Sequence, residues 1–427
     1  MIDLVAEAKA RRRRAFPVLI VEDERAANEA PAQAEELYEL IRSAECIPLE
    51  CEIVRSRSGH PKYLMGSGNA ELIARLAQEC EADCLVFDTS LSPSQQRNWE
   101  RLAKCHVIDR EELILDIFAA RARSREAVLQ VELARAQFML PRLTGAWGHL
   151  SRQQGGGATT RGEGEAQIEV DRRLLRRRIG QLRGELDELA RQRGTQRKAR
   201  RRRPVSQGAI VGYTNVGKSS LLRALTGADV LVRDQLFATL DPSSRRMVAF
   251  PDVVLSDTVG FVRRLPHSLI EAFKSTLEEA AQSDFLLLVL DISSPQLDME
   301  FETTLGVLKE LGADEKNIQI VFNKCDLVDP ERDAVELARL RSMFPDAVYI
   351  STRSGVGLDE LRARIGVLSS GARATVHVLL PPSRHDLVAL AHRFGEVYEE
   401  NYTPEGDVEM RFAIVKKYQH KYAEFEI

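Results

Sequence analysis

The sequence predicts an α/β protein of several domains that is organised around one glycine-rich loop. The loop has the pattern G-x-x-x-x-G-K-S and runs from Gly212 to Ser219. An apolar run at 208–211 precedes it, and apolar residues at helical spacing follow it, which is the strand–loop–helix context that this pattern requires. Strand and helix patterns alternate along much of the chain and predict mostly parallel sheets covered by helices. At 427 residues the chain is long enough for about three domains.

Residues 1–115 are expected to form an N-terminal α/β domain. The apolar and β-branched runs predict strands at 16–21, 46–54, 84–87 and 106–108. Two segments with apolar residues at helical spacing, 32–43 and 69–79, predict the helices between them. This alternation favours a small, mostly parallel sheet.

Residues 116–203 are expected to form a helical hairpin. Helical character runs from 111 to 150, a segment rich in glycine and threonine follows at 155–162, and an amphipathic helix is predicted over about 168–192. Two long helices joined by a loop predict an antiparallel pair, and the glycines predict a mobile loop whose tip projects from the body. The apolar face of the second helix consists of Leu174, Leu175, Ile179, Leu182, Leu186 and Leu189.

The glycine-rich loop at 212–219 belongs to a third domain, 204–371, and the chain ends in a small α+β unit, 372–427. Further strands of the third domain are predicted at 247–250, 253–256, 285–290, 318–322 and 348–350. In the last unit, strands at 375–380 and 408–415 are predicted on either side of a helix at 384–398.

The charge distribution is uneven although the net charge is only −4. Residues 171–203 hold fourteen Lys or Arg against four Asp or Glu, a balance of +10, which leaves −14 for the rest of the chain. A basic segment in an acidic protein favours a polyanionic partner. A solvated helix face is an equally good explanation for any single arginine, but not for RKARRRR at 197–203, where acids are absent.

Composition also favours a cytoplasmic protein. No apolar run approaches the roughly 20 residues of a membrane helix. The N-terminus MIDLVAEAKARRRR has no apolar segment of the signal-peptide kind. The six cysteines lack zinc-type spacing and are expected to be reduced thiols.

The loop is expected to bind a nucleotide. Its terminal glycines let successive N–H groups face one phosphate chain, and the following helix adds a partial positive charge at the same place. Lys218 can reach the outer phosphates and the Ser219 hydroxyl can bind Mg²⁺. A glycine-rich turn without a ligand is the weaker interpretation, because both motif and context are complete. The predicted loop residues are Gly212, Tyr213, Thr214, Asn215, Val216, Gly217, Lys218 and Ser219.

A second motif, NKCD, predicts that the base is guanine. It comprises Asn323, Lys324, Cys325 and Asp326 and follows a predicted strand. The Asp326 carboxylate can accept hydrogen bonds from N1–H and the 2-amino group of guanine. Adenine lacks this donor pair and would leave a buried carboxylate unpaired, at a cost of about 1–3 kcal/mol. With DTVG (257–260) between the two motifs, this part of the chain resembles a Ras-like P-loop GTPase, which implies GTP and GDP as the bound nucleotides.

The resemblance implies two nucleotide-sensing switches. Thr239 would reach Mg²⁺ in the first switch, Asp257 would hold Mg²⁺ through water, and the Gly260 N–H would meet the γ-phosphate in the second. Ser219, Thr239 and Asp257 are thus the implied metal ligands, and Lys218, Thr239 and Gly260 the catalytic residues. The first switch comprises Phe237, Ala238, Thr239, Leu240 and Asp241, and the second contains Asp257, Thr258, Val259 and Gly260.

Ser351, Thr352 and Arg353 stand where such enzymes usually carry S-A-K beneath the base. Only the backbone contact of Thr352 with the guanine oxygen carries over. Phe261 follows Gly260, where related enzymes often use glutamine to orient the attacking water. Its ring makes no hydrogen bond, so we expect slow hydrolysis in the free protein. Arg263, Arg264 and His267 are candidate helpers, although each is more typical of an ordinary surface residue.

The complete chain resembles the HflX family of ribosome-associated GTPases, in the Obg-related branch. Besides the motifs above, the resemblance rests on LSPSQQRNWE, LILDIFAARARSREAVLQVELARAQFMLPRL and W-x-HLSR before a glycine loop. It implies a monomer that binds the large ribosomal subunit, including ribosomal RNA, and that splits or rescues ribosomes or acts in subunit biogenesis. It also implies hydrolysis stimulated by ribosomes. Two departures are MGSGNAE at 65–71 instead of a GKGK-like turn, and TTRGEGEAQIE instead of GTRGPGETQLE.

Two other functions fit parts of the sequence. A pure binding switch would use nucleotide occupancy alone, with hydrolysis too slow to matter. An ATP-driven RNA remodeller would use the N-terminal domain, but residues 1–150 contain no second complete Walker loop.

Overall fold

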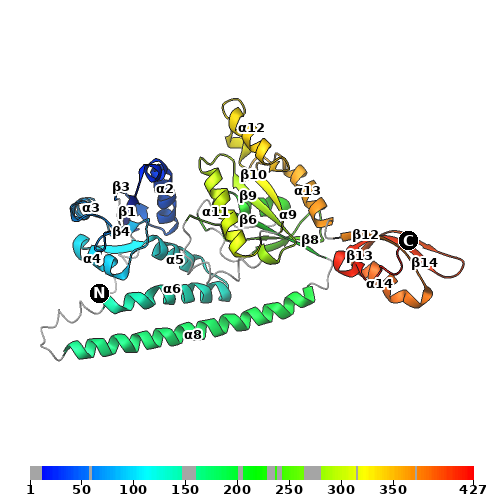
Figure 1. The fold of residues 1–427 in the computed structure, drawn as a ribbon, viewed down its shortest axis with the longest axis horizontal. Coiled ribbons are helices and arrows are strands. Elements are labelled where there is room, and N and C mark those ends of the chain that lie inside the picture. The colour runs from blue at the N-terminus through cyan, green and yellow to red at the C-terminus, as the bar shows by residue number, and fades with distance from the viewer. Residues whose placement is uncertain are drawn as a thin grey trace. The chain divides into compact units, whose positions relative to one another are not determined.

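The computed structural model describes residues 12–427 apart from 57–59, 147–159, 201–204, 228–235, 238–242, 264–279, 314–315 and 371–372. The chain divides into two compact units (Figure 1). The first contains Met1–Leu189, Arg233–Asp241 and Arg264–Lys274, and the second contains Ala190–Val232, Pro242–Arg263 and Ser275–Ile427. Among the described helices, none is long and apolar enough to cross a membrane.

The first unit contains a parallel sheet, as the sequence predicts. Strand β1 lies inside it, with β2 and β3 paired to one edge and β4 to the other, and β5 pairs with β4. The predicted strand at 46–54 is two short strands, because Pro48 cannot donate a ladder hydrogen bond and interrupts the pairing. The strands are β1 (Arg14–Val21), β2 (Ile47–Pro48), β3 (Glu52–Arg55), β4 (Cys84–Phe87) and β5 (His106–Asp109).

Helices α2 (Glu24–Ser43), α3 (Ser67–Glu79), α4 (Pro93–Ala103) and α5 (Arg110–Arg121) belong to this unit. The predicted helices at 32–43 and 69–79 are confirmed as α2 and α3, and α2 begins earlier, where Asp23 caps it. Helix α4 is absent from the sequence prediction. It begins with a capping box of Ser92 and Gln95, and its Trp99 is fully buried in the core.

The predicted helical hairpin is confirmed as α6 (Arg125–Ala146) and α8 (Thr160–Arg200). Arg125 pairs with Glu185 and Glu132 with Arg178, so the two helices run antiparallel. Leucines and isoleucine of the predicted apolar face lie in the core between them, except Leu174, which is 52% exposed and was wrongly assigned to that face.

The boundaries of the second helix differ from the prediction. Helix α8 begins at Thr160, inside the segment predicted as a glycine loop, and continues past residue 192 to Arg200. Each glycine costs about 1 kcal/mol in a helix, a penalty that does not stop propagation from a long helical segment. Residues 155–159 of the predicted loop lie outside the described part of the chain.

The second unit contains a six-stranded sheet in the order β11-β10-β9-β6-β8-β7, parallel except for β7. The prediction of a strand at 247–250 is wrong, because these residues form no strand. The edge strand is the polar segment β7, and of the apolar residues after it Met247 turns inward while Val248 is 71% exposed. The strands are β6 (Ser206–Gly212), β7 (Ser243–Arg246), β8 (Val253–Asp257), β9 (Phe285–Asp291), β10 (Asn317–Asn323) and β11 (Val348–Tyr349).

Helices α9 (Lys218–Thr226), α11 (Leu297–Glu310), α12 (Ala334–Met343) and α13 (Leu358–Ser370) accompany this sheet. The chain ends in an antiparallel sheet of β12 (Arg373–Leu380), β14 (Val408–Val415) and β13 (Gly395–Tyr402), with α14 (His385–Phe394) and α15 (Lys416–Gln419). The helix predicted to reach 398 stops at Phe394, because Gly395 begins β13, a largely exposed strand with no apolar alternation.

Candidate nucleotide-binding site

The predicted motifs meet at the carboxyl edge of the six-stranded sheet. The phosphate-binding loop follows β6, Asp257 ends β8 and Asn323 ends β10. Parallel strands present their carboxyl ends at one edge of a sheet, where open α/β folds bind ligands. The Asn323 side-chain amide donates to the Val216 carbonyl at 2.8 Å, which ties the base motif directly to the loop.

Two glycines of the loop are required by its geometry. Gly212 has φ +152°, and a Cβ there would lie 2.2 Å from the carbonyl oxygen of Val289. Gly217 has φ +94°, and its Cβ would lie 2.3 Å from the Asn323 amide nitrogen. L-residues rarely adopt such φ values, and both contacts involve tightly held neighbours. The loop conformation therefore depends on glycine at both positions.

Lys218 is the buried cation of the site. Its ammonium donates to the carbonyl oxygens of Gly212 at 3.1 Å and Tyr213 at 2.6 Å. Burial lowers the pKa of Lys218 to about 8, and the negative charge of Asp257 opposes this shift. The lysine thus lies at the loop with a charge that anionic phosphates would stabilise.

Ser219 and Asp257 form an oxygen-rich pair next to this lysine. The Ser219 hydroxyl donates to Asp257 Oδ2 at 2.6 Å, and Asp257 is fully buried. A hydroxyl and a carboxylate are the ligand types that Mg²⁺ prefers, so the pair fits the predicted metal. The described residues contain no group of three or more His, Cys, Asp or Glu able to hold a metal. Thr239, the third predicted ligand, lies outside them.

The predicted second switch begins in close contact with the loop. A Cβ on Gly260 would lie 2.7 Å from Thr214 Cγ2 and 2.8 Å from the Lys218 ammonium, so no larger residue fits there. The Phe261 N–H donates to the Gly212 carbonyl at 3.1 Å, and the Phe261 carbonyl accepts from the Thr214 N–H at 2.8 Å. The Phe261 ring is 2% exposed. A buried ring cannot orient water, as the sequence predicts.

Thr214 has an unusual hydroxyl. The residue is 6% exposed, and its Oγ1 is buried without a hydrogen-bond partner among the described residues. Nearly all buried polar groups in proteins are hydrogen-bonded, so an exception calls for a reason. The sequence predicts Thr214 only as one of the residues of the nucleotide-binding loop, and its immediate neighbours Tyr213 and Asn215 give no signal that the hydroxyl would be buried without a partner.

Side-chain hydrogen bonds hold the predicted base-binding motif in place. The Asn323 carbonyl oxygen accepts from the Thr352 N–H at 3.1 Å, and the Ser351 hydroxyl donates to Asp326 Oδ1 at 2.6 Å. This second bond holds the pKa of Asp326 below its usual value, so the carboxylate is ionised at neutral pH. Lys324 pairs with Asp291 at 2.7 Å. Asp291 ends β9 and was missed by the sequence analysis, although an acid at a strand end is a recognisable signal.

One assumption about Asp326 is wrong. The sequence argument for guanine treated this carboxylate as buried, whereas the structure leaves it exposed. Loops lie on the protein surface, so a carboxylate in such a loop loses contact with water when a ligand covers it. The selectivity argument therefore applies to the carboxylate as covered by a base.

The predicted first switch lies within the described residues only at its start. Phe237 is 2% exposed, and its ring meets Phe118 of α5 edge-on with centroids 4.6 Å apart. The Leu236 N–H donates to the hydroxyl of Ser43, which ends α2, at 3.1 Å. These contacts lie within the first unit, so Phe237 binding to nucleotide stays a prediction. Residues 238–241, Arg264 and His267 lie outside the described residues, while the Arg263 N–H donates to the Tyr213 hydroxyl at 2.5 Å.

Three family models match successive parts of the chain. They are described as GTP-binding GTPase N-terminal (residues 31–119), GTP-binding GTPase Middle Region (121–200) and 50S ribosome-binding GTPase (207–324). The first two correspond to the N-terminal sheet and the helical hairpin, and the third contains the phosphate loop and ends inside the base motif, after Lys324.

Relatives match nearly the whole chain. A GTPase HflX from Akkermansia muciniphila is 49% identical over 92% of this chain and 92% of its own length. The GTPase HflX of Escherichia coli (strain K12) is 40% identical over 88% of each. A solved structure described as the complex of SsGBP with GDP is 25% identical, covers 84% of this chain and 99% of its own, and has a TM-score of 0.50. The chain therefore belongs to the HflX family of GTPases and is a GTP-binding P-loop hydrolase.

Proposed function

We propose that this GTPase associates with the large ribosomal subunit in the cytoplasm, contacts ribosomal RNA, and splits or rescues ribosomes or acts in subunit biogenesis. The observation that carries the proposal is the convergence of Lys218, Asp257 and Asn323 on one loop, in a chain that also matches the 50S ribosome-binding model. The convergence of these side chains supports nucleotide binding, and the match to the 50S ribosome-binding model supports the large ribosomal subunit as the partner.

The proposed nucleotide complex uses the residues of the loop and the two motifs. Lys218 would bind the outer phosphates, and Asp326 would bind the guanine base. Ser219 and Asp257, with Thr239, would hold Mg²⁺, whose charge would offset the negative charge of the phosphates. These roles follow from the oxygen pair of Ser219 and Asp257 and from the buried lysine beside it.

Hydrolysis is proposed to be slow in the free protein. Phe261 is buried and leaves no glutamine to orient water. The Thr214 hydroxyl is a candidate to contribute, because it is buried without a partner among the described residues, and the methyl group and Cα of the same residue border Gly260 beside Lys218. We assign it a positioning role toward the attacking water or the terminal phosphate. Docking on the ribosome would complete the switches and raise turnover, as partners of other GTPases do by about 10³–10⁵-fold.

Ribosome binding is proposed to use the basic face of α8. Arg173, Arg177 and Arg183 are exposed on this helix, and they have no ion-pair partner among the described residues. Exposed arginines on a rigid helix suit the phosphates of RNA. The arginines at 197–203, stressed by the sequence analysis, lie where side chains are not described.

The proposal is tested by cosedimentation with purified ribosomal subunits. With a non-hydrolysable GTP analogue, we expect the protein to pellet with large subunits and not with small subunits alone. Lys218→Ala should lose the nucleotide-dependent part of this binding, because it removes charge-assisted bonds of about 1.5–3 kcal/mol each. Equal pelleting with either subunit, whatever the nucleotide, would refute the proposed partner.

A pure binding switch remains the second candidate, and the burial of Phe261 favours it. In that case nucleotide occupancy alone would control docking, and large subunits would bind the protein without accelerating hydrolysis.

A further inference from the structure

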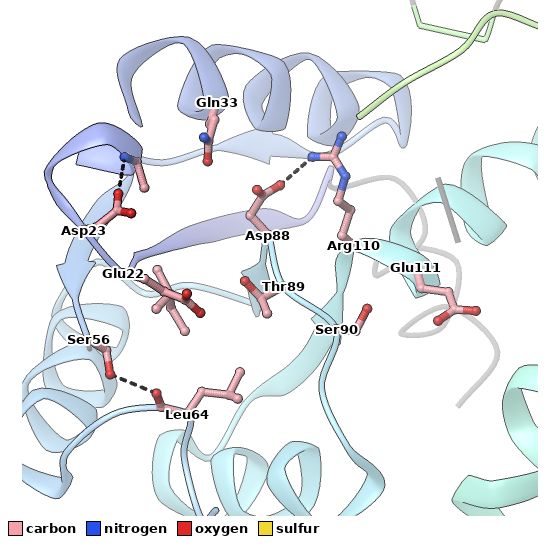
Figure 2. A pocket seen from close by; sticks show the side chains of 12 residues that line it. Glu22, Asp23, Gln33, Ser56, Leu64, Asp88, Thr89, Ser90, Arg110 and Glu111 are labelled. Carbon is pink, nitrogen blue, oxygen red and sulfur yellow. Dashed lines mark hydrogen bonds and ion pairs between the residues drawn. The ribbon is translucent and has the colours of Figure 1, made fainter. Parts of the chain in front are cut away.

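The first unit has a cavity of about 370 Å³ that the GTPase site does not involve (Figure 2). It is lined by residues that directly follow four strands of the parallel sheet: Glu22 and Asp23 after β1, Ser56 after β3, Asp88 after β4 and Arg110 after β5. Its volume is in the range of small-molecule sites, about 300–1,000 Å³.

The topology places this cavity where open α/β sheets bind ligands. From β1 the chain moves to β3 on one side, and it then crosses to β4 and β5 on the other side of β1. The connections after β1 and β4 therefore diverge and leave a crevice between the two strand ends. Such a switch point at the carboxyl edge is the usual ligand site of doubly wound folds.

The charge of the cavity is negative. Its described lining contains four carboxylates and one guanidinium, a formal charge of −3. The guanidinium, Arg110, is engaged by Asp88 at 2.5 Å and also by Glu36. With its cation held by two acids, the cavity offers no described side chain that would attract a phosphate.

The helix ends beside the cavity do not supply an anion site either. Asp23 caps α2 by accepting from the Ala26 N–H at 2.7 Å, and Asp109 caps α5 by accepting from the Glu112 N–H at 2.9 Å. Each helix N-terminus thus already has its own carboxylate, which satisfies the partial positive charge that a bound phosphate would need.

A neutral acceptor and apolar walls complete the cavity. Gln33 is 5% exposed and extends from α2 into it (Figure 2). Its amide nitrogen donates to Glu29 at 3.5 Å, while its carbonyl oxygen accepts no hydrogen bond from the described residues. Ile20 and Leu64 add apolar surface, which suits carbon chains rather than a bare ion.

We propose that this cavity binds a small organic cation with several N–H donors, of the polyamine class. The carboxylates of Glu22 and Asp23 would pair with ammonium groups, the Gln33 carbonyl would accept an N–H, and the apolar walls would contact methylene groups. Among the described residues, the negative lining and the capped helix ends do not suit the phosphates of a nucleotide.

The test is calorimetric titration of the full chain with spermidine at about 150 mM salt, which screens diffuse attraction. We expect a single site with Kd below about 1 mM. Glu22→Gln should weaken binding roughly twofold to fivefold, because Glu22 is exposed and exposed ion pairs are weak. Gln33→Met keeps the charge and removes the acceptor, so it should weaken binding roughly threefold to tenfold.

The matched control is Glu71→Gln, which makes the same charge change at an exposed position of α3 outside the cavity. It should leave spermidine affinity unchanged. Equal effects of Glu71→Gln and Glu22→Gln would show attraction to an acidic surface and overturn the site. If ADP binds the cavity and prevents spermidine from binding, the assignment to a cation is wrong. It is also wrong if the folded protein does not bind spermidine. GTP turnover plays no part in these outcomes, so they are independent of the proposed ribosomal role.

Discussion

At the residue scale, the buried hydroxyl of Thr214 destabilises the fold and is proposed to act in GTP hydrolysis. A buried hydroxyl without a partner destabilises a fold by about 1–3 kcal/mol. We predict that Thr214→Val, which keeps the shape of the side chain, raises the melting temperature by a few degrees. The same change should lower kcat about tenfold to a hundredfold with little change in KM, if the hydroxyl acts on the water or the terminal phosphate.

Thr214→Ser is the matched variant, because it keeps the hydroxyl and should retain most of kcat. Single-turnover hydrolysis and thermal melts of the three proteins decide the matter. A valine variant that turns over at the parental rate would remove Thr214 from the mechanism.

Lys218 should make nucleotide binding depend on pH. Burial lowers its pKa to about 8, and bound phosphates would raise it again. GDP binding above this pKa must therefore take up a proton. We predict a roughly fourfold loss of affinity between about pH 7 and about pH 8.5, with proton uptake visible by calorimetry in buffers of different ionisation enthalpy.

The lowered pKa of Lys218 affects the stability of the fold in the opposite direction, because stability increases as pH rises. Because the folded pKa lies below the unfolded one, this lysine destabilises the fold at neutral pH, and the penalty is relieved as pH rises from about 8 towards the unfolded value. Affinity for GDP that stays flat across this range would show that the lysine is charged throughout.

Asp326 should set base selectivity. Asp326→Asn places an amide donor where guanine also presents donors, and we predict a preference shifted from GTP towards xanthosine triphosphate by at least roughly tenfold. Competition binding with the two nucleotides measures the shift. Glu331→Gln, an exposed charge removed in the turn that follows, should retain the parental preference. If both variants still prefer GTP equally, the base contact is misassigned.

At the element scale, α8 presents its arginines as one face of a helix. We predict that Arg173→Gln combined with Arg177→Gln weakens ribosome binding. The slope of log affinity against log salt is negative, and its magnitude should decrease by about 0.7–0.9 for each RNA phosphate that the variant no longer neutralises. Arg101→Gln with Lys104→Gln removes the same charge from exposed positions at the end of α4 and should change the slope less. Equal slopes for all variants would mean that α8 is only a solvated helix.

The elements that the sequence predicted best are those with a strong period or motif. The strand–loop–helix around Lys218 and the strand before NKCD are predicted directly from their amino-acid sequences. Helix α4 could also have been found, because Ser92, Pro93 and Gln95 form a capping box with proline at the first helical position. Strands β7 and β13 could not, because both are polar and exposed, and pairing with β8 and β14 alone makes them strands.

Parts of the site depend on tertiary contacts that no local pattern encodes. The Thr214 hydroxyl is buried without a partner among the described residues, in a residue whose methyl group and Cα pack against Gly260, and Asp326 is exposed on the loop after β10. The Lys324–Asp291 pair joins the residue after β10 to the last residue of β9. Sequence motifs identify which residues take part, whereas burial and pairing are set only when distant segments meet.

At the scale of the whole molecule, the GTPase motifs occur in a chain whose N-terminal and middle regions belong to the same family. The start of the predicted first switch is buried among residues of the first unit, through Phe237 on Phe118 and Leu236 on Ser43. A nucleotide that reorganises this switch must therefore break contacts of about one aromatic pair and one hydrogen bond, each worth roughly 0.5–1.5 kcal/mol. A large partner that stabilises the reorganised switch would couple docking to hydrolysis.

The most direct test of the account is the rate of GTP hydrolysis under single-turnover conditions, with and without purified large ribosomal subunits. We predict slow hydrolysis by the free protein, because Phe261 cannot orient water, and acceleration by orders of magnitude at saturating large subunits. Small subunits serve as the control and should have no effect. Rapid hydrolysis by the free protein, or a rate unchanged by large subunits that demonstrably bind it, would contradict ribosome-stimulated hydrolysis.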